Sequence, residues 1–322
     1  MTSRGLFYLK FWLLLMSVLL SSCDRPYQDR LKVGANHWVG YFPLYLAESE
    51  GLLAKSNTQL LEYSSSVDVI RALKNRVINA AALTLDEAMT LADTGYPLRI
   101  ILVADISDGA DIIVARQSIK TVAELKGKRV GVENTAVGGF MLSRALSLNG
   151  LSSTDITVVP TSIDNHIQHL RQGDIDAVVT FASELRHLQG YPVTKIFDSS
   201  AIPNEIVDVL VVNAEWQDEA QLVALAKSWF KSWHSWQEGK VNRELLAQQL
   251  GLSESELLEV LSTLKMGDIQ VNQSFLNQSP PSLYLSIQRL QDLMLEEHLL
   301  SSKLSANAAF IIDPSIYKKA SQ

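Results

Sequence analysis

Aromatic and polar side chains follow the first apolar run of the sequence. Asn36, Trp38 and Tyr41 surround Gly40, directly after the run 31–35. Aromatic rings combine a large apolar surface with a polar tip, and their faces attract cations, so this loop suits a planar or cationic solute. The alternative is that Trp38 and Tyr41 simply pack between two parts of the protein. We take Asn36, Trp38 and Tyr41 as candidate ligand contacts.

Two further loops could present hydroxyl groups and backbone N–H groups to a ligand. Ser64 and Ser65 precede a predicted helix, and backbone N–H groups at a helix N-terminus bind anions. Plain N-capping by a serine is the alternative. In the loop 133–139, glycines allow a ligand to approach the backbone closely. The candidate contacts of that loop are Glu133, Thr135, Val137 and Gly138.

Carboxyl groups lie at the ends of other predicted strands. The candidates there are Thr84, Asp86, Asp105 and Asp208, with Ser107 and Asp111 close to Asp105 in the sequence. No Lys or Arg occurs in the candidate loops, although sites for sulfonates or nitrate often use a cation or several N–H donors. The acidic loops therefore favour a neutral or amine-bearing solute, such as a pyrimidine-like compound. Equally, these acids could cap helices and face water.

Signals for catalysis or metal binding are weak. His166 and His169 stand three residues apart on a predicted helix, but no further His or Cys lies close to them, so we expect no metal site. No serine has a Gly-x-Ser-x-Gly context, and there is no phosphate-binding loop. Trp229, Trp233 and Trp236 have the spacing of a buried helix face. We expect no cofactor and no catalytic residue.

The composition excludes other classes of protein. The chain has 322 residues, of which 47% are hydrophobic, a formal net charge of −7 and one cysteine. One cysteine cannot form an internal disulfide. The apolar fraction argues against disorder, and the acidic balance argues against a nucleic-acid partner. The length suits about two domains.

Short apolar runs alternate with helical patterns along most of the chain. Such runs are typical of strands covered on both faces, and their alternation with helices predicts an α/β fold with a parallel core. Beyond Val212 the pattern is almost wholly helical. The candidate strands are 31–35, 60–63, 80–84, 99–104, 112–116, 129–133, 156–160, 177–181, 193–197 and 207–212.

The first part of the sequence repeats weakly at a shift of 97 residues. Lys32-Val33-Gly34 aligns with Arg129-Val130-Gly131, and Ile78-Asn79-Ala80 aligns with Ile175-Asp176-Ala177. Any two βαβ units share some features, but a constant shift across three strands indicates two equivalent units. We therefore predict two similar lobes joined by a hinge, 31–111 with the helical tail 209–322, and 112–208. Ligands would bind between the lobes, beyond the ends of the strands.

The N-terminus has the pattern of a bacterial export signal. Arg4 and Lys10 precede an apolar run over 11–20, which is too short for a stable membrane span. Leu20-Ser21-Ser22-Cys23 then resembles a lipobox. We expect residues 1–22 to be a signal peptide, Cys23 to be lipidated and residues 23–30 to be a tether. An ordinary signal peptide with an incidental cysteine is the alternative.

Four segments together point to a known family. They are 36–47, 64–70, 82–88 and above all 122–132, which reads Val-Ala-Glu-Leu-Lys-Gly-Lys-Arg-Val-Gly-Val. They resemble type II periplasmic solute-binding proteins of the nitrate, taurine, alkanesulfonate and thiamine-pyrimidine importers, over about 31–214. Many of these proteins have a Trp-Glu-Pro-like segment where this chain has Thr180-Phe181-Ala182-Ser183-Glu184. We therefore expect Phe181 to supply an aromatic contact at that place.

The resemblance implies a receptor that captures a small solute by lobe closure and delivers it to an ABC permease and ATPase. The solute would be pyrimidine-like, an amine or a sulfonate. With the export signal, we expect a lipid-anchored monomer at the periplasmic face of the inner membrane, as Asp24 indicates, or at the surface of a Gram-positive cell. Two alternatives stay open. One is an enzyme of the same fold acting on a pyrimidine or menaquinone precursor, which the export signal disfavours. The other is a sensor that presents its ligand to a signalling partner.

Overall fold

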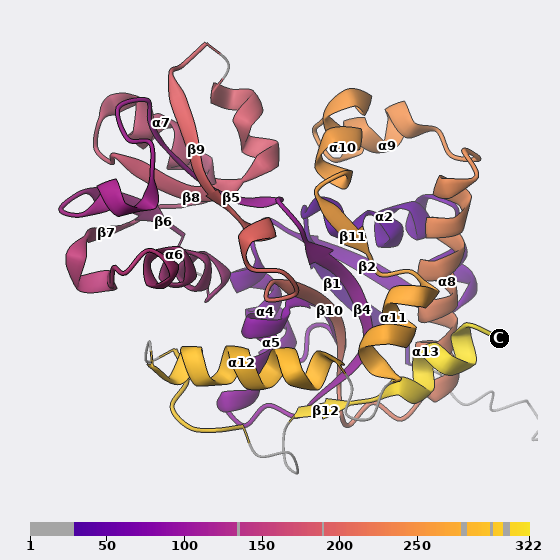
Figure 1. Ribbon diagram of the computed structural model, residues 1–322. Helices are drawn as coiled ribbons and strands as arrows, with labels where there is room; N and C mark the ends of the chain where they lie inside the picture. The colour runs from indigo at the N-terminus through magenta and orange to yellow at the C-terminus, as the bar shows by residue number, and fades with distance from the viewer. Residues whose placement is uncertain (1–28, 134–135, 189, 278–281, 297–298, 305–309) are drawn as a thin grey trace, which may run out of the picture. The chain divides into compact units, whose positions relative to one another are not determined.

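The apolar runs of the sequence form the strands of two separate sheets (Figure 1). The computed structural model describes residues 29–322 apart from 134–135, 189, 278–281, 297–298 and 305–309. The first sheet has seven strands in the order β11-β4-β10-β3-β1-β2, with β12 pairing β4. Its strands are β1 (Leu31–Asn36), β2 (Thr58–Tyr63), β3 (Ala80–Thr84), β4 (Leu98–Ser107), β10 (Val207–Asn213), β11 (Leu264–Met266) and β12 (Phe310–Ile312).

The second sheet has five strands in the order β7-β6-β8-β5-β9. They are β5 (Asp111–Arg116), β6 (Arg129–Val132), β7 (Thr157–Pro160), β8 (Ala177–Phe181) and β9 (Val193–Asp198). We call the elements around the first sheet lobe one and those around the second sheet lobe two. Both lie in one compact unit, Leu31–Gln322. The prediction of an α/β protein with two lobes is therefore confirmed.

The two sheets share one internal arrangement. β1 pairs with β2 and β3 in parallel, as β6 pairs with β7 and β8. A Cβ atom on Gly34 would lie 2.5 Å from Ile78 Cδ1, and one on Gly131 would lie 2.6 Å from Ile175 Cδ1, so both strands need glycine for this close approach. These pairs are related by the predicted shift of 97 residues, which confirms that the two units are equivalent.

Two connections join the lobes. The chain leaves lobe one after β4 and enters the second sheet at β5, and it returns after β9, where β10 inserts between β3 and β4. β10 is antiparallel to both of its neighbours. Two adjacent connections of this kind can act as a hinge. The lobe boundaries 31–111 with 209–322, and 112–208, stay a prediction.

Helices cover both sheets (Figure 1). In α8 of the tail, Trp229 and Trp236 are buried and Trp233 is partly buried. The ring of Phe42 lies 5.7 Å from Trp233 and 5.1 Å from Trp236, so the predicted tryptophan face is a buried one. The helices are α2 (Phe42–Ser49), α3 (Leu52–Lys55), α4 (Ser66–Lys74), α5 (Leu85–Asp93), α6 (Ala136–Leu148), α7 (Ile163–Gln172), α8 (Glu219–Gln237), α9 (Arg243–Gln249), α10 (Glu254–Leu261), α11 (Ile269–Leu276), α12 (Ser282–Glu296) and α13 (Pro314–Ala320).

The tail also contributes strands that the sequence pattern does not predict. β11 and β12 each have three residues and both pair with β4. Strands this short contain no readable periodicity, so the expectation of an almost wholly helical tail missed them. The predicted signal peptide and Cys23 lie outside the described residues. Within the described part, every helix is too short or too polar to cross a membrane.

A bulge in β4 directs one candidate site residue. Asp208 pairs with Asp105 but Val209 pairs with Val103. Ala104, which lies between these two residues of β4, therefore has no register partner in β10. The buried Asn272 of α11 holds this region, because its side-chain oxygen accepts the Val103 N–H at 2.8 Å and its side-chain nitrogen donates to the Val103 carbonyl at 3.0 Å. The position of Asp105 therefore depends on a tail helix.

Asn272→Leu should lower the free energy of unfolding by about 2–5 kcal/mol, because two buried backbone groups of Val103 lose their partner. Urea denaturation followed by circular dichroism measures this change. Asn277→Leu, at the exposed end of α11, is the matched control. A loss below about 1 kcal/mol would mean that other contacts hold the bulge.

Candidate functional site

A cavity of about 430 Å³ lies where the two lobes meet, lined by loops that follow the strands of both sheets. This volume is in the usual range for small-molecule sites. The predicted candidates that line it are Asn36, Trp38, Tyr41, Ser64, Ser65, Thr84, Asp105, Glu133, Val137, Phe181 and Asp208. Asp86 is buried but does not line the cavity, Gly138 does not line it either, and Thr135 lies outside the described residues. Ligand binding by these residues stays a prediction.

An aromatic pair bridges the two lobes at the cavity. The ring of Trp38, which precedes the short 3-10 helix Val39–Tyr41, lies 5.1 Å from the ring of Phe181 at the end of β8, with an angle of 52° between the planes. Trp38 Nε1 donates a hydrogen bond to Asp105 Oδ2 at 3.3 Å. A Cβ atom on Gly40 would lie 2.0 Å from that same oxygen, so glycine is required beside it.

Two buried carboxyl groups face each other in neighbouring strands. Asp105 of β4 and Asp208 of β10 are register partners, with side chains 1% and 4% exposed. Burial raises the pKa of Asp105 to about 7, and burial together with the Asp105 charge raises the pKa of Asp208 well above its usual value. Hydrogen bonds from Trp38 and Asp208 to Asp105, and from Tyr41 to Asp208, offset part of this effect. The arrangement favours a proton shared within the pair.

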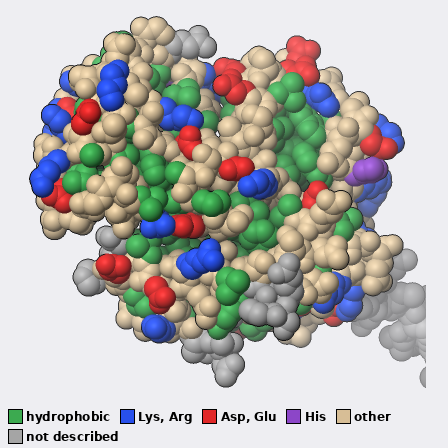
Figure 2. Space-filling view, in the orientation of Figure 1, with side chains coloured by type: hydrophobic (Ala, Val, Ile, Leu, Met, Phe, Trp, Pro, Cys, Tyr) green, Lys and Arg blue, Asp and Glu red, His purple; other side chains and the backbone are tan. Residues whose placement is uncertain are grey.

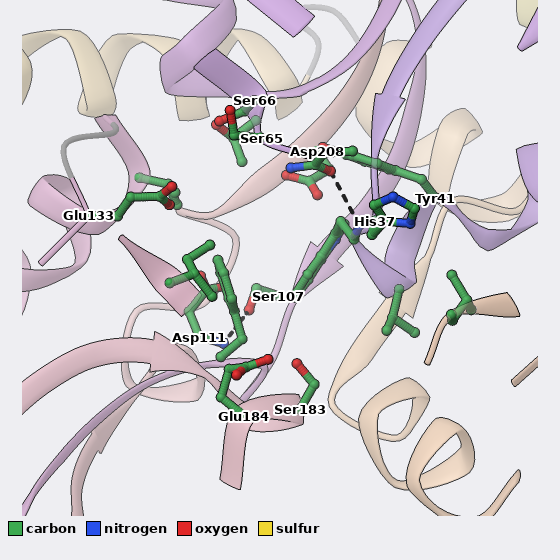
Figure 3. A pocket seen from close by; sticks show the side chains of 18 of the residues that line it. His37, Tyr41, Ser65, Ser66, Ser107, Asp111, Glu133, Ser183, Glu184 and Asp208 are labelled. Atoms are coloured by element: carbon green, nitrogen blue, oxygen red, sulfur yellow. Dashed lines mark hydrogen bonds between the residues drawn. The ribbon is translucent and has the colours of Figure 1, made fainter. Parts of the chain in front are cut away.

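Further acids surround the pair. Asp111 is the first residue of β5 in lobe two. Burial, together with the nearby Glu87 charge, raises the pKa of Asp111 to about 6, although the hydrogen bond with Ser107 lowers it in part. Burial also raises the pKa of Glu87, and it raises that of Glu133, with help from the charges of Glu87 and Asp164, to about 7. Figure 3 shows Asp111, Glu133 and Asp208 around the same space. The possibility that these acids face water is wrong for Asp105, Asp111 and Asp208, which are buried.

The helix N-termini at the cavity already hold carboxylates. The hydroxyls of Ser64 and Ser65 both donate to Asp68 Oδ2, at 3.2 and 3.0 Å, and Ser65 caps α4. Glu87 accepts the Thr84 backbone N–H at 3.1 Å in a capping box at α5. Ser65 therefore does cap its helix, as the alternative interpretation proposed. The spacing Thr84-x-x-Glu87 is that of a capping box, which places Glu87 at the start of α5. This signal could have identified Glu87, rather than Asp86, as the acid that lines the cavity.

One cationic side chain that lines the cavity was not predicted from the sequence. Among the described residues that line the cavity, Arg186 is the single Lys or Arg. It lies in the 3-10 helix Ala182–Leu188 of lobe two and donates through Nη1 to the carbonyl of Gly251, between α9 and α10. Leu250 and Leu252 line the cavity beside Gly251. No local motif in the sequence connects residue 186 with the tail, so only the folded chain shows this contact.

His166, the first of the two spaced histidines, is held in the interior of lobe two. His166 is buried, its ring nitrogens lie 3.3 Å from Thr180 Oγ1 and 3.2 Å from the Thr161 carbonyl, and burial lowers its pKa to about 4. Within the described ranges, no group of three or more His, Cys, Asp or Glu side chains is arranged to hold a metal ion.

Asp208→Asn should become more stabilising as the pH rises. Because the native-state pKa is raised, the native protein keeps a proton that the unfolded chain has released above about pH 4, so the stability of the wild type is lost as pH rises towards the native pKa. The loss is up to about 1.4 kcal/mol per pH unit, and asparagine does not incur it. Urea denaturation of both proteins between about pH 4 and pH 8 measures the difference.

Asp292→Asn, at an exposed position, should show a difference that barely changes over this range. A pH-independent difference for Asp208→Asn, or one that falls with rising pH, would contradict the raised pKa.

The fold has relatives of known structure. The alkanesulfonate-binding protein SsuA of Xanthomonas axonopodis pv. citri, bound to MOPS, has a TM-score of 0.68 at 18% identity, over 84% of this chain and 94% of that one. The periplasmic aliphatic sulphonate binding protein SsuA of Escherichia coli has a TM-score of 0.68 at 20% identity, over 89% and 94%. The desulfurization enzyme DszB has a TM-score of 0.64 at 16% identity, over 91% and 99%. Likeness at these identities shows the fold, and it confirms the predicted periplasmic-binding-protein architecture.

Comparison of sequences gives one relative and one family. The taurine-binding periplasmic protein of Escherichia coli (strain K12) is 21% identical over 150 residues, which are 46% of this chain and 47% of that protein. The match thus spans about half the length of this curated relative. The model of the NMT1-like family matches residues 24–251, which is more than half of the chain. The resemblance seen in the sequence is confirmed at this level: the chain belongs to the NMT1-like family.

Proposed function

We propose that this protein is the solute-binding receptor of an ABC importer and acts outside the cytoplasm. The observation that carries the proposal is the cavity itself, whose wall comes from both lobes and includes Trp38 from one and Phe181 from the other. Opening it requires movement at the two connections between the lobes, and closing it would surround a small molecule on all sides.

Membership of the NMT1-like family and likeness to taurine- and sulfonate-binding proteins support this function. The solute would be a small organic molecule of the pyrimidine-like, amine or sulfonate class. The partners would be an ABC permease and its ATPase, and the receptor would act as a monomer without cofactor. Cys23 would carry the lipid that holds it at the membrane.

A solute panel tests the receptor function. Pyrimidines, amines, sulfonates and inorganic anions are screened for a rise in melting temperature, which mass action requires of anything that binds the native state. Mass spectrometry of the recovered compound should find it unchanged, whereas an enzyme of this fold would convert it. A panel without any stabilising compound would contradict the proposal.

Trp38→Ala should weaken the binding of any compound found by about 1–3 kcal/mol, because buried aromatic side chains at such contacts have effects of this size. Isothermal titration calorimetry measures the change, with Tyr284→Ala on the exposed part of α12 as the control. Unchanged affinity would assign Trp38 a purely structural role between the lobes.

Cys23→Ala should abolish incorporation of labelled palmitate, since the thiol is the attachment point in a lipobox. Growth with labelled palmitate, followed by membrane fractionation, compares the variant with the wild type. Equal labelling of the two proteins would refute lipidation at this residue.

A further inference from the structure

We propose that the solute carries a cationic nitrogen group, an ammonium or an amidinium, which binds against Asp105 and Asp208 on the inner wall of the cavity. The proposal rests on the receptor function and selects one of its three solute classes. It also implies that a sulfonate without a cationic nitrogen is not the solute, although two of the similar structures are named for alkanesulfonates and aliphatic sulphonates.

The balance of charge in the cavity is strongly acidic. Among the residues that the structure describes there, seven carboxyl side chains line the cavity against the one guanidinium of Arg186. The Arg186 side chain is partly used already, because it donates to the Gly251 carbonyl and to His187. On the outer face shown in Figure 2, by contrast, acidic and basic side chains are interspersed. The acidity of the cavity is therefore not shared by that face.

One buried oxygen of a residue at the cavity wall has no hydrogen-bond partner among the described residues. Asp208 is 4% exposed, and its Oδ1 has no hydrogen-bond partner among the described residues. Asp208 lines the cavity, and Figure 3 shows it at the cavity wall near Tyr41. A buried acceptor without a donor is costly to leave unmet. An N–H group of a cationic solute would supply that donor.

Three helix N-termini at the cavity that could hold an anion already have carboxylates. Asp68 receives the hydroxyls of Ser64 and Ser65 at the start of α4, and Glu87 receives the Thr84 N–H at the start of α5. Asp164 lies in the first turn of α7, which also begins at the cavity. An incoming sulfonate would meet a carboxylate at each of these positive helix ends, so repulsion would replace attraction.

The aromatic pair fits the same class of solute. The ring of Trp38 lies beside Asp105, to which it donates, and it contacts the ring of Phe181. Aromatic faces attract cations, and a planar amidinium can donate two parallel hydrogen bonds to a carboxylate. A flat molecule with a cationic edge would satisfy both the rings and the acids.

Binding of the cation should displace the proton that Asp105 and Asp208 share, and this proton passes to the solvent. The titratable groups that face the pair are Tyr41, Glu87 and Asp111, with Trp38 as a neutral donor. Since all three titratable groups are acids, none of them adds positive charge when the pH falls through neutrality. Affinity for a cation should therefore decrease towards acidic pH, where the acids become neutral.

Three compounds of nearly equal shape test the charge preference: benzamidine, benzamide and benzoate, which are cationic, neutral and anionic at neutral pH. Calorimetry on the full mature chain should show benzamidine binding at least about tenfold more tightly than either of the others, since its hydrogen bonds involve charged partners on both sides. Its affinity should fall between about pH 8 and pH 5. Equal or tighter binding of benzoate, or no binding of benzamidine, would overturn the proposal.

Two isosteric variants assign the effect to the pair. Asp208→Asn and Asp105→Asn should each weaken benzamidine binding by about tenfold or more, and should weaken benzamide binding by much less. Asp292→Asn makes the same change of net charge at an exposed position and should bind benzamidine like the wild type. Melting curves confirm that each variant is folded.

Ethanesulfonate, which has no nitrogen, separates the cationic solute from the receptor function on which the proposal rests. If ethanesulfonate binds more tightly than benzamidine and draws the lobes together in small-angle scattering, the receptor function stands and the cationic solute is wrong. If no compound of any charge binds, both fail.

Discussion

The register between β10 and β4 sets Asp208 directly opposite Asp105 in the interior of the protein. Two adjacent carboxyl groups cannot both ionise there without a large cost, so the surrounding structure must supply donors or a proton. Trp38 and Tyr41 supply donors from the first loop, and Gly40 leaves the space that Asp105 needs. The bulge in β4, held by Asn272, directs Asp105 to this place. The site is thus built around a pair that is unfavourable when empty and that a cation would relieve.

The same strand connects the site with lobe movement. β10 follows directly on the second connection between the lobes and carries Asp208 at its start, while Asp111 opens β5 after the first connection. The hydroxyls of Ser107 and Ser199 lie 2.7 Å apart between these two segments, and the Gly109 N–H donates to Ser199 Oγ. A ligand bound at Asp208 that also reaches Asp111 would therefore contact a strand that follows each connection. This gives a physical reason for solute binding and lobe closure to be coupled.

Much of the fold could be predicted because it is duplicated. Gly34 with Ile78, and Gly131 with Ile175, repeat one packing contact at a constant spacing, and the apolar runs around them are long enough to identify as strands. The residues of the site could be predicted less completely from the sequence than the strands. Trp38, Glu133 and Phe181 lie at or after strand ends and do line one cavity. Arg186, Leu250 and Leu252 also line it, but only the packing of the tail against lobe two brings them there. β11 and β12 are fixed by pairing with β4 rather than by local pattern. Asn36 and Trp38 could be predicted as cavity residues because they lie at the end of a strand, where ligands bind in open α/β sheets. Leu250 and Leu252 lie between two helices, a position with no such rule.

The most direct measurement of the central claim is the identity of the solute that the protein carries when purified from its own cells without denaturation. Native mass spectrometry gives the mass of the complex, and fragmentation of the released compound gives its functional groups. The structure predicts a small organic molecule with a cationic nitrogen group and a flat or apolar part for Trp38 and Phe181. A bound sulfonate or other anion without a cationic nitrogen would contradict the account.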